Sequence, residues 1–266
     1  MDLTVDRLKI GSKLVFGKYG VNNDSPYPIV WLKASPNCDF ITESVLDYLC
    51  FDAMEPAAES HMEQYNGNPR FALSNIFSFL NSDAEQWFSP SHPVDCPPGR
   101  RYIGANAEYE THYGFLYHFE EYETESLVRT RTELEGENIF SLIRLPQEDE
   151  IVGLNRFKLF SRKGVRPKGT DDMLNGRNRG FTFESYIPFW LTNRERDIYV
   201  KAISRNGGFD YISPCNPCGI RPVCNIKPDT VVVPCDNDMF VVRPYAVSQN
   251  ICTDAEFLDF LGLARP

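Results

Sequence analysis

Residues 13–19 read KLVFGKY, residues 28–33 read PIVWLK, and the cluster VNNDSP lies between them at 21–26. Both apolar runs contain the aromatic and β-branched residues that favour strands, and the cluster between them is typical of a turn. The pattern therefore predicts a β-hairpin. Because a further turn follows, and then the apolar run at 39–42 with the 45–46 region as a third strand, we expect an N-terminal meander of three strands over residues 13–46.

The composition extends this β-rich expectation to the rest of the 266 residues. The chain contains 19 Phe, 13 Tyr and 3 Trp, and its 19 Pro and 17 Gly favour many turns. We therefore expect an α+β fold that is rich in strands and has short helices. The further strands are expected at 113–122, 126–134, 137–143, 183–191, 198–203, 209–212, 220–226, 230–233 and 239–242.

Two helices carry recognisable end signals. Asn68 can cap a helix over 69–80, in which Pro69 suits the first turn and apolar residues recur at helical spacing. Thr253 and Glu256 match a capping box at the start of a helix over 253–262. Single helical turns are expected at 84–88 and 147–152.

The net charge of −10, from 27 basic and 37 acidic side chains, makes nucleic acid an unexpected partner. The charge is unevenly divided along the chain. Residues 101–150 carry 12 acidic and 4 basic side chains, and residues 151–180 carry 8 basic and 2 acidic ones. We interpret the two blocks as solvated faces, with a head-to-tail contact between copies as the alternative.

No run of about 18 apolar residues occurs, so no membrane insertion is expected. Residues 1–7 lack the basic and apolar regions of a secretory signal. We therefore expect folding in a reducing cytoplasm. The 8 Cys are then expected to be thiols.

Four cysteines form a candidate metal set. Cys215 and Cys218 are separated by two residues between prolines, and Cys224 and Cys235 follow. Four thiolates can bind zinc, but the usual signal is two Cys-x2-Cys pairs, and this chain has one. Cys224 and Cys235 also lie in apolar, strand-like surroundings. We favour buried thiols, and structural zinc and a redox pair stay open as alternatives.

No catalytic residue is assigned from the sequence. The histidines lack metal-ligand spacing, and they are expected on loops or the surface: His61, His92, His112 and His118. The chain also lacks the nucleophile-elbow, phosphate-loop and dinucleotide motifs. Arg177, Asn178 and Arg179, in a basic, Gly-rich loop at 161–181, are a weak candidate for holding an anionic ligand. No cofactor is expected.

Several short motifs occur in order over about residues 10–230. They are Phe16-Gly17-Lys18-Tyr19, Pro28-Ile29-Val30-Trp31, Ser44-Val45-Leu46-Asp47, Phe79-Leu80-Asn81, Phe189-Trp190-Leu191-Thr192, Tyr199-Val200 and Gly219-Ile220-Arg221-Pro222-Val223. This order resembles an uncharacterised domain family of bacteria and their phages, with a Phe-Gly hairpin, a Pro-Ile-x-Trp strand, a Leu-Asn helix end, a Trp-Leu-Arg segment and a Gly-Ile-Arg-Pro strand. The closing part resembles C-type-lectin-like folds, which include formylglycine-generating enzymes and phage receptor-binding proteins. This chain departs from the motif at Thr192, where the family has Arg.

The resemblance implies one C-type-lectin-like domain over residues 1–235, with an insertion at about 100–135, and a C-terminal extension over 236–266 that carries the short helix. Trp31 and Trp190 are expected to fill the core, and Gly219 to permit a tight backbone. Arg221, within an apolar strand, is expected to pair with a buried carboxylate or with carbonyls.

The expected function is that of a non-catalytic structural or binding subunit, most simply a phage virion component: a capsid decoration, tail or receptor-binding protein. Such a component would be made in the cytoplasm of the host. Its expected partners are other virion or surface proteins and further copies of itself, and a host glycan is a further candidate. The first alternative is a cytoplasmic carbohydrate- or protein-binding module of a bacterium. The second is an oxidase related to formylglycine-generating enzymes, although Cys215 and Cys218 do not match the copper-binding pair of that family.

Overall fold

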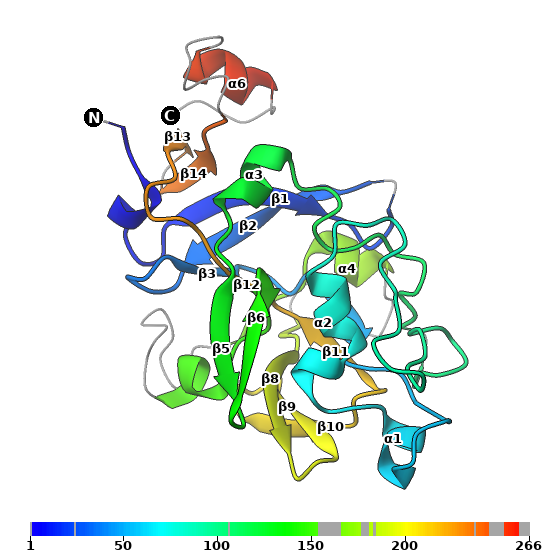
Figure 1. The fold of residues 1–266 in the computed structure, drawn as a ribbon. Helices are drawn as coiled ribbons and strands as arrows, with labels where there is room; N and C mark the ends of the chain where they lie inside the picture. The colour runs from blue at the N-terminus through cyan, green and yellow to red at the C-terminus, as the bar shows by residue number, and fades with distance from the viewer. Residues whose placement is uncertain are drawn as a thin grey trace.

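A computed structural model describes residues 2–23, 25–105, 107–153, 166–176, 181–182, 185–236, 238–244 and 253–260. Two larger sheets and a separate hairpin dominate the fold, and the helices are short (Figure 1). The predicted β-rich α+β class is confirmed at this level. Among the described residues, no helix is long and apolar enough to cross a membrane.

The seven-stranded sheet contains the predicted meander. Its strand order is β13 (Val232–Asp236), β14 (Met239–Val242), β1 (Lys13–Tyr19), β2 (Tyr27–Lys33), β3 (Asp39–Thr42), β12 (Val223–Asn225) and β7 (Ile143–Arg144). β1, β2 and β3 pair antiparallel in succession, which confirms the expectation from the opening motifs. β14 pairs with β1 in parallel.

A bulge explains the Phe-Gly pair of β1. The register between β1 and β2 shifts between Val15 and Lys18, and Gly17 there has a φ of 66°. A side chain at Gly17 would also overlap the ring of Phe119. The indole of Trp31 donates a hydrogen bond of 2.8 Å to the Phe16 carbonyl at this bulge. The Phe16-Gly17 pair therefore forms the β-bulge at which the hydrogen-bond register between β1 and β2 shifts.

The five-stranded sheet has the order β10 (Phe209–Ile212), β9 (Tyr199–Ile203), β8 (Phe189–Glu195), β11 (Pro217–Ile220) and β4 (Asp47–Cys50). The predicted strand at 220–226 is wrong as a single element, because the chain leaves this sheet after β11 and enters the other sheet as β12. β3 and β4 make the opposite crossing. Two backbone hydrogen bonds join the segment between β3 and β4 to the segment between β11 and β12. Thr42 N–H donates to Pro222 O at 3.1 Å, and Leu46 N–H donates to Ile220 O at 3.0 Å.

The third sheet is a hairpin of β5 (Thr130–Leu134) and β6 (Glu137–Ser141). Its turn residues, Glu135 and Gly136, have φ angles of 55° and 83°. Such a pair of positive angles is typical of a tight two-residue turn whose twist matches that of the strands. The hairpin stands beside β8 and β9 in Figure 1.

The helices are η1 (Val5–Arg7), α1 (His61–Asn66), η2 (Phe71–Leu73), α2 (Asn75–Leu80), α3 (Glu121–Ser126), η3 (Asp149–Gly153), α4 (Asp171–Gly176) and α6 (Asp254–Phe260). The expected helix over 69–80 is divided into η2 and α2. Ser74, and not Asn68, caps α2, because the Ser74 hydroxyl accepts the N–H of Phe77 at 3.3 Å. The Asn68 side chain instead accepts the N–H of Arg70 at 3.0 Å, and the Asn68 N–H donates to Asp52. The helical turn expected at 84–88 is absent from this described segment.

The expected strand at 113–122 is wrong: turns occupy most of it, and α3 begins at Glu121. Glu120 and Glu123 form a capping box, and the Glu123 carboxylate also accepts the N–H of Gly17 at 2.8 Å. Phe115 and Phe119 are buried, and Phe119 packs edge-on against Phe16. The segment expected as an insertion at 100–135 is therefore part of the core.

The end of the sheet extends past the boundary predicted at residue 235. β14 lies between β13 and β1, so the boundary falls within a hairpin of the seven-stranded sheet. The predicted capping box of the last helix is confirmed, because Thr253 and Glu256 exchange hydrogen bonds with each other's backbone N–H. Leu258 of α6 packs on Val233 and Val241, beside the β13–β14 hairpin (Figure 1).

Candidate functional site

The four residues that were expected to be structural are all buried. The indole of Trp190, on β8, donates a hydrogen bond of 2.9 Å to the carbonyl of Leu49 on β4. The Trp190 side chain therefore reaches past β11, which lies between these two strands. A side chain at Gly219 would lie 2.7 Å from Val45 Cγ1 and closer still to Pro188 O. The expected core role of Trp31 and Trp190 and the tight backbone at Gly219 are thus consistent with their geometry.

Arg221 lies at the crossing between the two sheets. Its Nε donates to Thr42 O at 2.9 Å, and its guanidinium lies 5.4 Å from the centroid of the Phe189 ring. The Arg221 pKa is lowered, because burial disfavours the charged form. Carbonyl oxygens are therefore among the partners of this cation, as the sequence led us to expect, and its role here is to join β3 to β12.

The four cysteines of the candidate zinc set, Cys215, Cys218, Cys224 and Cys235, do not form one cluster. Cys218, Cys224 and Cys235 lie on β11, β12 and β13, and the Cys235 side chain belongs to a core cluster separate from that of the other two. Burial raises the pKa of the Cys215, Cys218 and Cys224 thiols, which disfavours the thiolate that a metal would need. In the described parts of the chain, no group of three or more His, Cys, Asp and Glu could hold a metal ion. Arg177, Asn178 and Arg179 lie outside the described residues.

The sequence analysis did not predict two clusters of buried polar side chains. Asp47 accepts the Tyr19 hydroxyl at 2.6 Å, and His112 Nδ1 lies 3.9 Å from the same oxygen. His112 lies in a loop, as expected, and its side chain is largely buried beside a carboxylate. The group joins the end of β1 to the start of β4. Tyr19 and Asp47 each end one of the motifs quoted above, but neither motif predicted that the two side chains meet.

The second group is a row of carboxyls. Asp52 accepts the N–H groups of Asn68 and Asn75, each at 2.8 Å. The Glu55 side chain hydrogen-bonds to Asp52 and to Asp95. Burial, followed by the nearby charges of Asp95 and Glu63, raises the pKa of Glu55 to about 7. Because two carboxyls share a hydrogen bond only if one is protonated, this row couples the folding of the 52–55 segment to pH.

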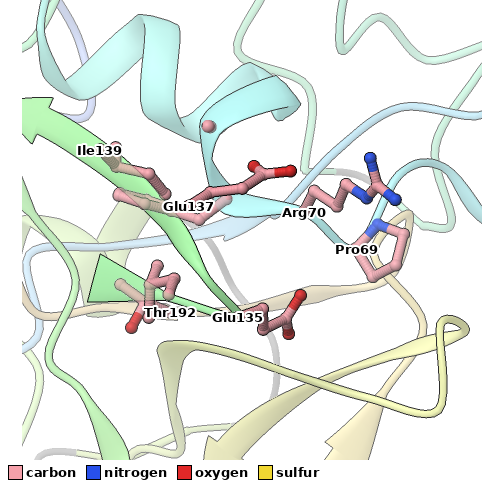
Figure 2. Close-up of a pocket in the computed structure, with 9 residues that line it drawn as sticks. Pro69, Arg70, Glu135, Glu137, Ile139 and Thr192 are labelled. Carbon is pink, nitrogen blue, oxygen red and sulfur yellow. The ribbon is translucent and has the colours of Figure 1, made fainter. Parts of the chain in front are cut away.

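A small pocket opens between the β5–β6 hairpin, η2 and β8 (Figure 2). The space around it is about 280 Å³, which includes open solvent, and only about 20 Å³ of it can hold the centre of a water molecule, so the pocket has room for about one water. Figure 2 shows Glu137 and Ile139 on one side and Pro69 and Arg70 on the other. Nine residues line it: Pro69, Arg70, Phe71, Ala72, Leu134, Glu135, Glu137, Ile139 and Thr192. A sequence signal for one of them existed, because Thr192 is the position at which the chain departs from the Trp-Leu-Arg motif.

An aromatic surface lies on the outer strands of the five-stranded sheet. Tyr199 of β9 and Phe209 and Tyr211 of β10 are 40 %, 37 % and 49 % exposed. Tyr211 pairs with Lys201 and Phe209 with Ile203, so the alternation of the strands places these side chains on one face. We call Tyr199, Phe209 and Tyr211 the aromatic face.

Charged side chains at the centre of the aromatic face are paired. Lys201 Nζ lies 2.7 Å from Glu148 and 3.5 Å from Glu195, and 5.9 Å from the centroid of the Phe209 ring. The hydrogen bond to Glu148 raises the pKa of Lys201. The charge of Lys201 is therefore balanced by these two carboxylates. The exposed part of this surface is mainly aromatic.

Comparison of this chain with protein-family models, with curated proteins and with solved structures found no match.

Proposed function

We propose that this protein is a non-catalytic binding and assembly subunit with a C-type-lectin-like fold, and that it is a phage virion component, whether capsid decoration, tail or receptor-binding protein. The aromatic face is the observation that supports the proposal. Three large rings, each more than a third exposed, are grouped on two adjacent strands. Grouped aromatic side chains are typical of surfaces that bind a partner, whereas single exposed ones are ordinary.

The face of β10, and not its edge, is the surface that is available to a partner. β10 is the last strand of its sheet. The Asp210 carboxylate accepts the N–H of Tyr211 at 2.9 Å, and a charged side chain of this kind protects a strand edge against pairing with another strand. The proposed contact is therefore made by the rings, with other virion or surface proteins or with further copies of the chain.

The test is the native mass of the purified protein, measured by light scattering over a range of concentrations, alone and with candidate virion partners. We expect an oligomer or a mixed complex, and the double change Phe209→Ser and Tyr211→Ser should weaken it at least about tenfold. Tyr65→Ser is the matched control, because Tyr65 is 60 % exposed on α1, outside the aromatic face, and this change should leave the mass unaltered. A monomer at every concentration, with and without partners, would refute the proposal.

The bacterial carbohydrate- or protein-binding module remains the second candidate, since the aromatic face would serve it equally. A monomer that binds a glycan through Tyr211 would favour it. The oxidase alternative fits less well. Cys218 lies within the core, and Cys215 Sγ is in contact with Tyr65 O at 3.6 Å. These two thiols, with pKa values raised by burial, are a poor donor set for copper.

A further inference from the structure

The β9–β10 hairpin carries the aromatic face at the end of the molecule away from α6 (Figure 1). Tyr211 is the central ring, because it pairs with Lys201 in the ladder and Phe209 precedes it by two residues on the same strand. Tyr199 precedes Lys201 by two residues on the neighbouring strand. The three rings therefore form a short diagonal row, in which rings two residues apart on a strand are separated by about 7 Å.

The charge of this region differs from that of the whole chain. The chain has a net charge of −10, so two copies repel each other over most approaches. Residues 189–212, which contain β8, β9 and β10, carry four basic and three acidic side chains. Two of the basic ones, Lys201 and Arg194, form ion pairs with Glu148 and Asp197 of the same chain. A second copy therefore meets almost no net charge here, and like-charge repulsion at this surface is small.

A head-to-tail contact between copies would need a second surface that complements the aromatic face. Outside that face, six large apolar side chains of the described residues are more than a third exposed. No two of them share a strand, helix or loop: Ile10, Tyr27, Tyr65, Tyr117, Phe140 and Tyr186. In the described part of the chain, the surface that matches the aromatic face best is therefore the same face of another copy.

We propose that two copies of this chain bind each other through the aromatic face, about a two-fold axis that passes close to Tyr211, an inference that rests on the assembly role proposed above. In such a dimer both copies use the same patch, so a ring near the axis packs against its own counterpart. Phe and Tyr rings suit this contact, since they pack offset or edge to face with each other, and a Tyr ring keeps a polar end that tolerates water.

The exposed area of the rings sets the strength of this contact. A buried aromatic side chain covers about 150–250 Å², and the three rings are between 37 % and 49 % exposed. They therefore supply on the order of 200–300 Å² per copy, against about 800 Å² in a standard interface. Charged side chains in the turn before Tyr199 add a polar rim, since Arg196 and Asp197 are 85 % and 78 % exposed. We expect a reversible dimer with a dissociation constant that is roughly micromolar or weaker.

Salt distinguishes this dimer from the head-to-tail contact that the acidic block at 101–150 and the basic block at 151–180 would form. Attraction between opposite charges is screened by salt, so a head-to-tail contact weakens as salt is added. The face-to-face dimer instead buries rings, and added salt screens the repulsion between two chains of net charge −10. Its dissociation constant should therefore stay the same or fall between about 50 mM and about 500 mM NaCl.

The test is analytical ultracentrifugation of the whole chain, at concentrations up to about 1 mM, with Tyr211→Glu, Tyr211→Lys and an equal mixture of the two variants. Either variant alone places like charges beside the axis, so the dimer should weaken at least about tenfold. The mixture sets opposite charges across the axis and should recover most of the lost affinity. Tyr65→Glu and Tyr65→Lys are the matched controls, because Tyr65 is 60 % exposed on α1, outside the aromatic face, and both should dimerise as the wild type does.

Three results would each overturn the dimer: the wild type alone stays monomeric, salt dissociates it, or the mixture recovers no affinity although both variants unfold in urea as the wild type does. The salt series needs no variant, so it decides the question even if a change at Tyr211 unfolds the chain. A chain that is monomeric alone but binds a virion protein through Phe209 and Tyr211 contradicts the dimer and leaves the assembly role standing. A chain that is monomeric with every such partner, or that binds only a glycan there, contradicts both.

Discussion

Replacing Glu55 by Gln is expected to make the stability of this protein less dependent on pH. The Glu55 side chain is 3 % exposed and hydrogen-bonds to the Asp52 and Asp95 carboxyls, and Glu63 is nearby. Burial raises its pKa from 4.5 to about 7. Gln is nearly isosteric, can donate the same hydrogen bond and does not ionise.

The magnitude follows from linkage between protonation and folding. Because the pKa is raised in the folded state, the stabilising proton is fully effective below about pH 4.5, and its contribution is lost as the pH rises to about 7. The rise corresponds to about 3 kcal/mol of unfolding free energy. Glu55→Gln should therefore gain up to about 3 kcal/mol over the wild type between about pH 5 and about pH 8.

The assay is urea unfolding at a series of pH values, followed by tryptophan fluorescence, since Trp31, Trp87 and Trp190 are all buried. Glu59→Gln is the matched control, because it makes the same change at an exposed position four residues away. A difference between Glu55→Gln and the wild type that stayed constant from about pH 5 to about pH 8 would refute the proposed coupling.

Three further predictions concern stability and reactivity. Gly219→Ala should cost about 1–3 kcal/mol in urea unfolding, because the added methyl meets Pro188 O and Val45; a neutral result would contradict the tight crossing. Arg144→Leu should cost about 3–5 kcal/mol, since it strands Glu150, which is fully buried and 2.6 Å from the guanidinium, and adding Glu150→Leu should recover most of the loss. In native protein, a thiol reagent should modify the partly exposed Cys96 well before the buried thiols, and mass mapping that found Cys218 first would contradict their burial.

The meander illustrates what local sequence can predict. Residues 13–42 alternate strand-forming runs with turn clusters, and these strands pair with their sequence neighbours. The capping box at Thr253 and Glu256 is likewise complete within four residues. Where a strand or helix end forms its hydrogen bonds with residues close in sequence, the local sequence pattern predicted that strand or helix end.

The errors occur where partners are distant in sequence. The 113–122 segment has the aromatic content of a strand, but Phe115 and Phe119 are used to fill the space beside Phe16 and Tyr19, so the backbone forms turns. Similarly, Ser74 and not Asn68 caps the helix, which begins at Asn75, where the buried Asp52 carboxylate accepts the backbone N–H. In both cases tertiary contacts outweighed local preference.

The candidate sites were even less accessible to sequence reasoning. The pocket joins Arg70, Glu137 and Thr192 from three separate elements, and the aromatic face depends on the register of β9 and β10. The carboxyl row joins Glu55 to Asp95 across forty residues of chain. The departure from Trp-Leu-Arg at Thr192 singled out one residue, but no single stretch of sequence predicts any of these groupings.

By itself, the sequence determined that this is a β-rich chain with short helices, an N-terminal hairpin and a capped final helix, and it led us to expect Trp31, Trp190, Gly219 and Arg221 inside the fold, where they are buried. Only the tertiary structure decided that β11 and β12 belong to different sheets, that β14 completes the seven-stranded sheet, and that Thr192 lines a pocket. The physical reason is the range of the interactions. Turns, caps and alternation act over a few residues, whereas sheet order, burial of carboxyls and pockets arise from contacts between segments whose meeting no local pattern encodes.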